Sequence, residues 1–171
     1  QKVLAKVLIT GGGRCNLTNS FAQITDLKQA YPRGDKMMKR LFNVFSHKDT
    51  CQWFEQRGVK LVKQDDECVF PVSQSAQSVV DALTHEAHKL GVEVRTGYAV
   101  EAVKQMGNGD LQLLFKVQKP VTVQRAAITT GGSPQANALQ YLANLGHNIV
   151  QPVPSLFTFN IADATFKALM G

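Results

Sequence analysis

The most restrictive feature of this sequence is a pair of short apolar runs that each end in consecutive glycines. Val7–Thr10 runs into Gly11–Gly13, and Ala126–Thr130 runs into Gly131 and Gly132. A short apolar run bounded by turn residues fits a buried strand, and in open α/β sheets ligands bind beyond the carboxyl ends of the strands. We therefore predict two buried strands of a parallel sheet whose glycine loops approach one extended ligand from two sides.

The first glycine loop does not match the common nucleotide-binding fingerprints. A G-x-G-x-x-G pattern beginning at Gly11 would need glycine at position 16, which is Asn16, and the Gly-Lys-Ser/Thr of a Walker loop is absent. Consecutive glycines let backbone N–H groups converge on an anion or lie flat against a ring, and Arg14 adds a forked cation suited to phosphate. A tight structural turn with Arg14 and Asn16 at the surface fits this composition equally well.

The pattern between and after the two loops predicts an α/β core. Helices are predicted over 35–46, 49–57 (Asp49 as N-cap, Gly58 as stop), 75–90 and 136–145, and strands over 59–62, 68–70 and 92–95. Strand-like segments over 98–104, 111–117 and 121–124, separated by turn residues, predict an inserted antiparallel meander at about 98–124. We place this core at 1–154, and the alternating run after Pro154 predicts that a β-rich second domain starts at 155–171.

The positive charge is confined to one segment. The 171 residues contain 19 Lys and Arg against 13 Asp and Glu, a net charge of +6. The segment 28–63 holds nine basic and three acidic residues, so it carries the whole excess. A basic nucleic-acid-binding module is therefore an alternative function, but most aromatics of this segment fall on predicted apolar faces. We expect no nucleic acid as a partner.

The cysteines and the chain ends bear on compartment and completeness. Cys15, Cys51 and Cys68 show no Cys-x-x-Cys spacing, which predicts neither a redox pair nor a zinc site and favours a reducing, cytoplasmic location. No apolar run is long enough to span a membrane, so we expect no membrane association. The chain starts at Gln1 rather than Met and stops soon after a new strand pattern begins, so we expect a fragment of a larger protein.

Several motifs then carry a resemblance to a known family. The run 6–19 (KVLITGGGRCNLTN) resembles the signature of the BaiN/RdsA (YhiN-like) family of NAD(P)/FAD-dependent oxidoreductases. The similarity continues in order through 68–73 (CVFPVS), 90–97 (LGVEVRTG), 130–133 (TGGS) and 152–156 (PVPSL), and so covers nearly the whole chain.

The resemblance implies part of a Rossmann-like FAD domain with two dinucleotide-binding folds, interrupted by β structure. NAD(P)H would be the reductant, and the substrate would be an unidentified small organic molecule. It also implies that Val100 meets the adenine through its backbone and that Phe70 and Pro71 border the isoalloxazine. The residues that the resemblance assigns to FAD are Gly12, Gly13, Arg14, Cys15, Asn16, Thr18, Asn19, Val100, Thr130, Gly131 and Gly132. Because the hydride chemistry belongs to such a cofactor, we name no catalytic side chain.

The sequence departs from the family pattern at two places. The family begins with a strand and G-x-G-x-x-G, which would lie upstream of Gln1, so a fragment with no activity of its own is a further alternative. The stretch after Gly132 is also shorter than the glycine-rich loop of many relatives, which leaves no basis for flavin contacts beyond Ser133.

Overall fold

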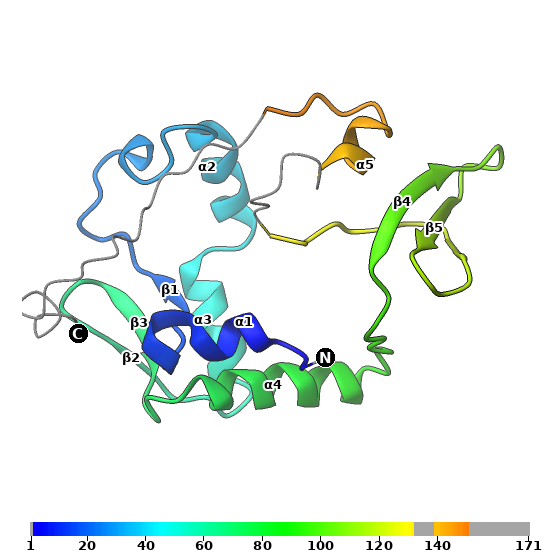
Figure 1. Ribbon diagram of the computed structural model, residues 1–171. Helices are drawn as coiled ribbons and strands as arrows, with labels where there is room; N and C mark the ends of the chain where they lie inside the picture. Colours follow the sequence, from blue (N-terminus) through cyan, green and yellow to red (C-terminus); the bar gives the residue numbers. More distant parts are fainter. Residues whose placement is uncertain (1, 132–138, 151–171) are drawn as a thin grey trace, which may run out of the picture. The chain divides into compact units, whose positions relative to one another are not determined.

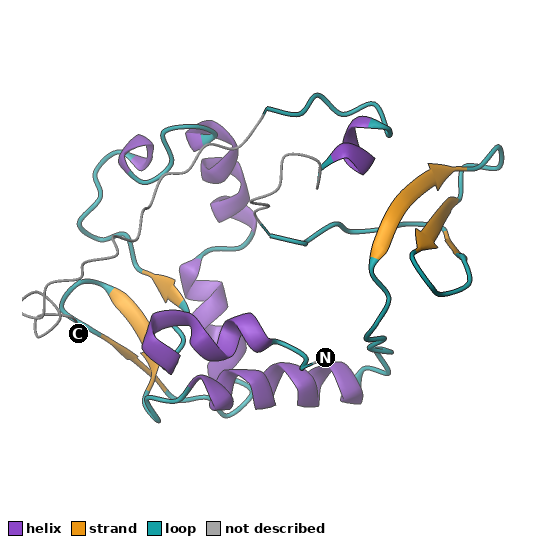
Figure 2. Ribbon diagram, viewed as in Figure 1, coloured by secondary structure: helices purple, strands orange, loops and turns teal. Residues whose placement is uncertain are grey.

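The computed structural model describes residues 2–131 and 139–150, and the chain divides into two compact units, Gln1–Thr96 and Gly97–Gly171. Figure 1 traces the chain through these two units. Figure 2 shows that the first unit combines helices with a small sheet, and that the second is built mainly from strands and loops.

The first unit contains four α-helices and three short strands among its described residues. The helices are α1 (Ala5–Ile9), α2 (Asp35–Val44), α3 (His47–Glu55) and α4 (Ala76–Lys89), with 3₁₀ turns at Thr10–Gly13 and Leu27–Gln29. The strands are β1 (Thr18–Asn19), β2 (Leu61–Lys63) and β3 (Cys68–Pro71), in the antiparallel order β1-β3-β2.

The core of the first unit forms where α3, α4 and the loop after α1 meet. Its buried members are Cys15, Phe54, Val59, Ala76 and Val79. The helix predicted over 75–90 is confirmed as α4, which buries Ala76, Val79 and Val80, whereas Leu90 just past its end is 68% exposed. Ser75 caps this helix by accepting a hydrogen bond from the backbone N–H of Gln77. The glycine loop is thus anchored to the core through the buried side chain of Cys15.

The strand predicted over Val7–Thr10 is wrong, because residues 5–9 form helix α1. A short apolar run suits a helix or a strand, and only a partner strand decides for the strand. Within the described ranges no strand pairs with 7–10, whereas Val7 and Leu8 pack against the core together with α4 residues Ala82 and Leu83. The first glycine loop therefore follows a short helix.

The helices of the basic segment are confirmed with one change of cap. Ser46, not Asp49, is the N-cap of α3, and Asp49 closes a capping box by accepting hydrogen bonds from the Ser46 N–H and hydroxyl at 2.7 and 2.6 Å. These bonds lower the pKa of Asp49. On α2, Phe42 packs against Phe21 and Tyr31, whose ring centroids lie 5.7 and 6.1 Å from its own.

An apolar face formed by α2 and the residue that follows it is exposed to solvent. Met37, Leu41, Val44 and Phe45 are 66%, 46%, 82% and 53% exposed. Most aromatics of the basic segment are predicted to lie on apolar faces. Phe54 is buried, Tyr31, Phe42 and Trp53 are half-buried, and Phe45 is exposed.

The second unit confirms the meander. Strands β4 (Val100–Gln105), β5 (Leu111–Phe115) and β6 (Val121–Val123) pair antiparallel in that order. The β4–β5 turn closes with a 2.8 Å hydrogen bond from the Met106 N–H to the Asp110 carbonyl, and Gly109 supplies the left-handed residue.

Two further predicted strands do not form. Residues 92–95 and 126–130 are exposed and outside any ladder among the described residues, so the predicted second buried strand is wrong as well. An apolar run forms a strand only where a neighbouring strand pairs with its backbone N–H and C=O groups.

The last predicted helix and the predicted second domain fall partly or wholly outside the described residues. The helix appears as α5 (Gln140–Ala143) and ends before the left-handed Gly146, as predicted, whereas 132–138 are not described. The segment 155–171 also lies outside the described residues, so the boundary at 154 stays a prediction. In the described part, no helix is long and apolar enough to cross a bilayer.

Candidate functional site

The glycine loop after α1 is a tight left-handed turn. Gly11, Gly12 and Gly13 have φ values of 54°, 66° and 82°, and Cys15 has φ 63°. The Cys15 N–H donates to the Thr10 carbonyl at 3.0 Å, and the Arg14 N–H donates to the Gly11 carbonyl at 3.3 Å. Three successive left-handed glycines make the turn tight, and the N–H groups of Arg14 and Cys15 are both used within it.

Gly11 and Gly12 require glycine for different reasons. A Cβ on Gly11 would lie 2.6 Å from the Asn16 backbone nitrogen and 3.1 Å from a ring carbon of Phe70, so Gly11 is a point of close approach. A Cβ on Gly12 would meet no atom within 4 Å, and Gly12 is exposed. The backbone at Gly12 is therefore open to a ligand.

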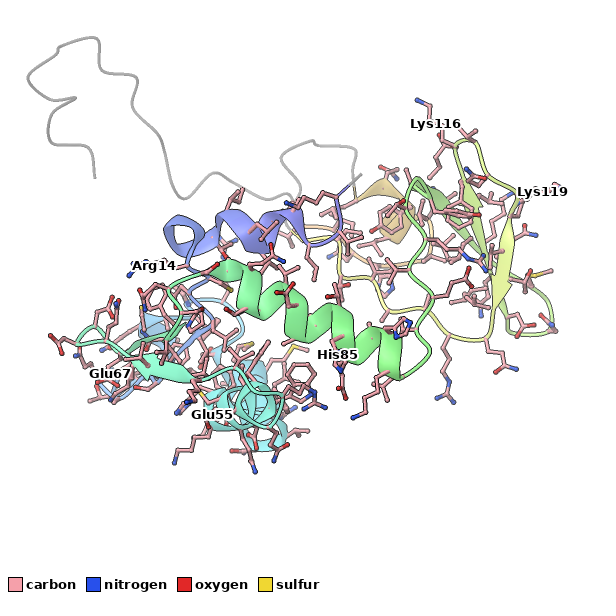
Figure 3. All side chains as sticks on the ribbon, turned by 90° about the horizontal axis from the view of Figure 1, so that it is seen from below. Arg14, Glu55, Glu67, His85, Lys116 and Lys119 are labelled. Atoms are coloured by element: carbon pink, nitrogen blue, oxygen red, sulfur yellow. The ribbon has the colours of Figure 1, made fainter. Side chains whose placement is uncertain are left out.

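Arg14, labelled in Figure 3, is held in place by three contacts. Its guanidinium carbon lies 4.3 Å from the centroid of the Phe70 ring, a cation–π contact. Its Nε donates to the Gly11 carbonyl at 3.3 Å, and its Nη1 donates to the side-chain oxygen of Gln74 at 3.3 Å. The ion pairs of the described residues join Arg57 to Glu86, Lys63 to Glu67 and Arg95 to Glu93, so none of them neutralises Arg14.

The asparagines of the motif meet Cys68 on the neighbouring strand. Strand β1 places Thr18 opposite Val69 and Asn19 opposite Cys68. The side-chain amides of Asn16 and Asn19 donate to the Cys68 sulfur at 3.2 and 3.6 Å. These contacts fix the amides of the loop against β3.

The β2–β3 turn is tied to the same loop through Glu67. The Ser20 hydroxyl and the Lys63 ammonium both bond to the Glu67 carboxylate, and the Lys63 nitrogen lies 2.8 Å from it. The hydrogen bond from Lys63 is the main cause that lowers the pKa of Glu67, followed by that from Ser20. The turn therefore remains charged and closed at neutral pH.

Phe70 and Pro71 are buried beneath the loop. Phe70 is 4% exposed, and Pro71 is among the least exposed side chains of the described structure. One face of the Phe70 ring carries the Arg14 guanidinium, and its edge faces Gly11. The Phe70 ring is therefore the surface against which the Arg14 guanidinium packs.

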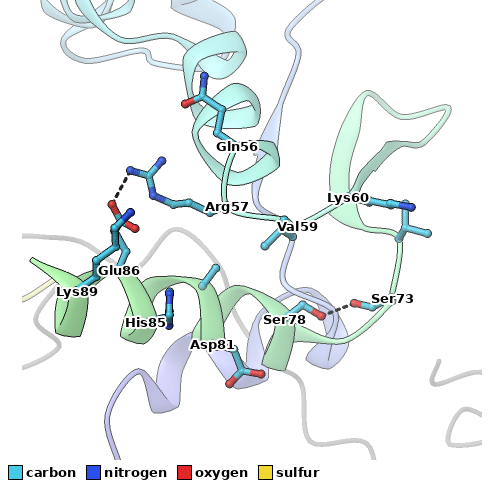
Figure 4. A pocket seen from close by; sticks show the side chains of 13 residues that line it. Gln56, Arg57, Val59, Lys60, Ser73, Ser78, Asp81, His85, Glu86 and Lys89 are labelled. Carbon is cyan, nitrogen blue, oxygen red and sulfur yellow. Dashed lines mark hydrogen bonds and ion pairs between the residues drawn. The ribbon is translucent and has the colours of Figure 1, made fainter.

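A second arginine stack lies just beyond the C-terminal end of α3, and Figure 4 shows the ion pair of its Arg57 with Glu86. The guanidinium carbon of Arg57 lies 3.7 Å from the centroid of Trp53, and its Nη2 pairs with Glu86 of α4 at 2.8 Å. Hydrogen bonding from Arg57 is the main cause that lowers the pKa of Glu86. The pair borders an open cleft of about 790 Å³ whose wall includes His85 and Lys60.

For the predicted site residues of the second unit, the structure gives only their surroundings within that unit. Val100 begins β4 and is 43% exposed. The Thr130 hydroxyl lies 3.5 Å from that of Tyr141, and Gly131 is left-handed at φ 75°. Gly132 lies outside the described residues. Convergence of the two glycine loops on one ligand therefore stays a prediction.

Gln74 is the residue of this site that the sequence does not single out. It lies between Ser73 and Ser75, ahead of α4, and no motif or spacing connects it with Arg14, 60 positions earlier. Only the turn that follows β3 brings its amide to the guanidinium. The one signal in the sequence is that a turn is expected before the helix predicted over 75–90.

Comparison with known proteins identifies the family. The HI0933-like protein Rossmann domain family matches residues 1–155. The chain belongs to this family. The predicted α/β, Rossmann-like class and the predicted resemblance are thereby confirmed, while the pairs of the described sheets are all antiparallel.

One curated relative of this HI0933-like chain is the 3-dehydro-bile acid delta(4,6)-reductase of Clostridium scindens. It is 25% identical over 177 residues, an alignment that covers 100% of this chain and 42% of the relative. The chain therefore spans less than half of that relative's length.

Proposed function

We propose that this HI0933-like chain supplies part of the FAD site of a flavin-dependent oxidoreductase. In this proposal NAD(P)H is the reductant and a small organic molecule is the substrate. The family match supports the nucleotide-binding role, and a relative named as a reductase supports reduction as the type of reaction.

One observation carries the proposal: Arg14 is oriented by its neighbours but is not neutralised by any carboxylate of the described residues. A half-buried guanidinium of this kind has forked donors available for a pyrophosphate. The exposed backbone of Gly12 lies two residues away, with free space where a side chain would be. The uncompensated charge of Arg14 and the open backbone at Gly12 support this proposal.

The individual residues have distinct roles in this proposal. Arg14 binds the pyrophosphate oxygens, and Gly12 and Gly13 let the backbone lie against the cofactor. Asn16 and Asn19, whose amides are fixed against Cys68, hold the loop in shape. The bound flavin would supply hydride transfer, for which the protein provides orientation and electrostatics.

The residues of the second unit enter the proposal only through the resemblance to the family. Val100 would meet the adenine through its backbone, and Thr130, Gly131 and Gly132 would form a second contact near the pyrophosphate. Two separate loops on one extended ligand are expected because FAD is longer than a single turn can cover.

FAD titration tests the proposal. The protein that carries this chain and the isolated 171-residue chain are titrated with FAD, and binding is followed by the visible absorption and the fluorescence of the flavin. We expect Arg14→Gln to weaken binding about tenfold or more, because a charged donor to phosphate is lost. Arg95→Gln is the matched control, since Arg95 is already paired with Glu93 at 2.7 Å.

The outcomes separate the alternatives. Binding by the longer protein but not by the isolated chain would show that this chain is only one part of the site. If neither binds FAD, or if Arg14→Gln and Arg95→Gln behave alike, the proposal is contradicted.

A further inference from the structure

Gln74 joins two segments of the site through the two ends of one amide. Its side-chain oxygen accepts a hydrogen bond from Arg14 Nη1 at 3.3 Å, and its side-chain nitrogen donates to the Pro71 carbonyl at 3.1 Å. A guanidinium only donates and a carbonyl only accepts, so only one orientation of the amide satisfies both partners. Gln74 therefore fixes the direction from which Arg14 is held.

The backbone at Gln74 is adapted to this contact. Its φ of 52° is left-handed, which is uncommon for a residue with a β-carbon. The Gln74 N–H also donates to the Pro71 carbonyl, at 2.9 Å. One carbonyl thus anchors both the backbone and the side chain of Gln74 at the end of β3.

The chemistry of the partner distinguishes Arg14 from two other arginines of the first unit. Arg57 and Arg95 are held by the carboxylates of Glu86 and Glu93, at 2.8 and 2.7 Å. Arg14 is held by a neutral amide instead. An amide fixes the geometry and leaves the positive charge uncompensated, whereas a carboxylate would fix the geometry and neutralise it.

We propose that Gln74 is a positioning residue for an anion: it orients Arg14 toward the pyrophosphate of FAD while keeping its charge available. This inference rests on the proposed function, because it assumes that Arg14 meets the phosphates of the cofactor. It adds a requirement that does not follow from family membership. The side chain at position 74 must accept a hydrogen bond without bearing a negative charge.

The test compares three substitutions at one position. Gln74→Glu keeps the acceptor but adds a charge, Gln74→Ala removes the acceptor, and Gln74→Asn keeps the amide while shortening its reach and tolerating the left-handed backbone. Gln77→Glu is the matched control, because it makes the same change of charge on an exposed glutamine that bonds to Asp81.

Affinity is measured for FAD and for riboflavin, which has the same ring system but no phosphate. We expect Gln74→Ala and Gln74→Asn to weaken FAD binding about threefold to tenfold, and Gln74→Glu to weaken it more than either. Riboflavin affinity should stay at its wild-type value. Gln77→Glu should behave as wild type with both ligands.

A double-mutant cycle links the effect to Arg14. In the Arg14→Gln background, Gln74→Glu should cause no further loss of FAD affinity, because the charge that it would neutralise is absent. An additive loss in this background, an equal loss for riboflavin, or an equal effect of Gln74→Glu and Gln74→Ala would overturn the inference.

The proposed function can fail separately. It fails if the wild-type protein does not bind FAD or if Arg14→Gln has no effect. The inference about Gln74 fails alone if Arg14→Gln weakens FAD binding while all Gln74 variants bind as the wild type does.

Discussion

Two guanidinium stacks in the first unit share a geometry but differ in charge balance. Arg14 lies on Phe70 at 4.3 Å and Arg57 lies on Trp53 at 3.7 Å. Arg57 also donates to the Trp53 carbonyl at 3.0 Å and pairs with Glu86, which ties the end of α3 to α4. Arg14 instead has one neutral side-chain partner, Gln74.

The difference shows how one side-chain pairing serves two purposes. Where a carboxylate completes the stack, the charges cancel locally and the arginine connects two helices, a structural role. Where an amide completes it, the arginine is ordered yet still cationic, which is what an anion site requires. The two stacks therefore differ mainly in the hydrogen-bond partner of the arginine, which is a carboxylate for Arg57 and an amide for Arg14.

The largest effect is expected from Gly11→Ala, which would displace the loop that carries Arg14. The new Cβ would lie 2.6 Å from the Asn16 backbone nitrogen, at a φ of 54°. We expect a loss of about 3 kcal/mol or more in the free energy of unfolding. Urea unfolding followed by circular dichroism measures this loss.

Gly12→Ala is the control for Gly11→Ala. Gly12 shares the left-handed backbone, with φ 66°, but its Cβ would meet nothing within 4 Å. The expected cost is about 1 kcal/mol, from the backbone alone. Equal losses for the two variants would show that close approach at Gly11 does not determine the loop.

Replacing the aromatic residue beneath each arginine, Phe70 or Trp53, tests the comparison directly. Phe70→Leu should lower the free energy of unfolding by about 1–2 kcal/mol and weaken FAD binding severalfold, because Arg14 loses its platform. Trp53→Leu removes the other aromatic ring and should leave FAD affinity unchanged. If Trp53→Leu weakens FAD binding as much as Phe70→Leu does, the distinction between the two stacks is wrong.

How far the sequence predicts this structure depends on how local each signal is. The helix that starts after Ser75 and the β4–β6 meander are predicted correctly, because caps, periodicity and turn residues act over a few positions. The runs at 7–10 and 126–130 are predicted incorrectly as strands, because a strand is decided by its neighbours in space.

The site shows the same limit. The motif 11–19 identifies Arg14 and the asparagines, and the structure places Arg14 and Asn16 on the glycine loop and Asn19 on β1, next to β3. It cannot identify Gln74, because contact between residues 60 positions apart leaves no periodic or motif signal. Nor does it show that Arg14 lacks a carboxylate partner among the described residues, although that fact carries the proposed function.

The ion pair between Arg57 and Glu86 should appear in the pH dependence of stability. Hydrogen bonding from Arg57 lowers the pKa of Glu86 below its ordinary value of 4.5. A carboxyl group whose pKa is lower in the folded state stabilises the fold above its unfolded pKa, and this contribution is lost as pH falls through the folded value. Glu86→Gln should therefore be less stable than wild type at neutral pH.

Urea midpoints measured from about pH 7 to about pH 3 test this expectation, because the difference between the two proteins should shrink toward acid. Asp49, Glu67 and Glu93, whose pKa values are also lowered, are common to both proteins and cancel in the difference. A difference that does not change with pH would contradict a stabilising ion pair between Arg57 and Glu86. FAD affinity should be the same in both proteins.

The smallest effect is expected from the cations that lack any stack. Lys36, Lys39 and Arg40 are exposed on α2, and the ion pairs of the described residues do not include them. Mobile surface charges act only at long range and are screened by salt. Replacing all three by glutamine should weaken NAD(P)H affinity about twofold at low salt and not at high salt, in steady-state titrations of the full protein. If affinity is unchanged at low salt, these charges serve only solvation, and the cationic contribution to nucleotide binding lies with Arg14 alone among the four.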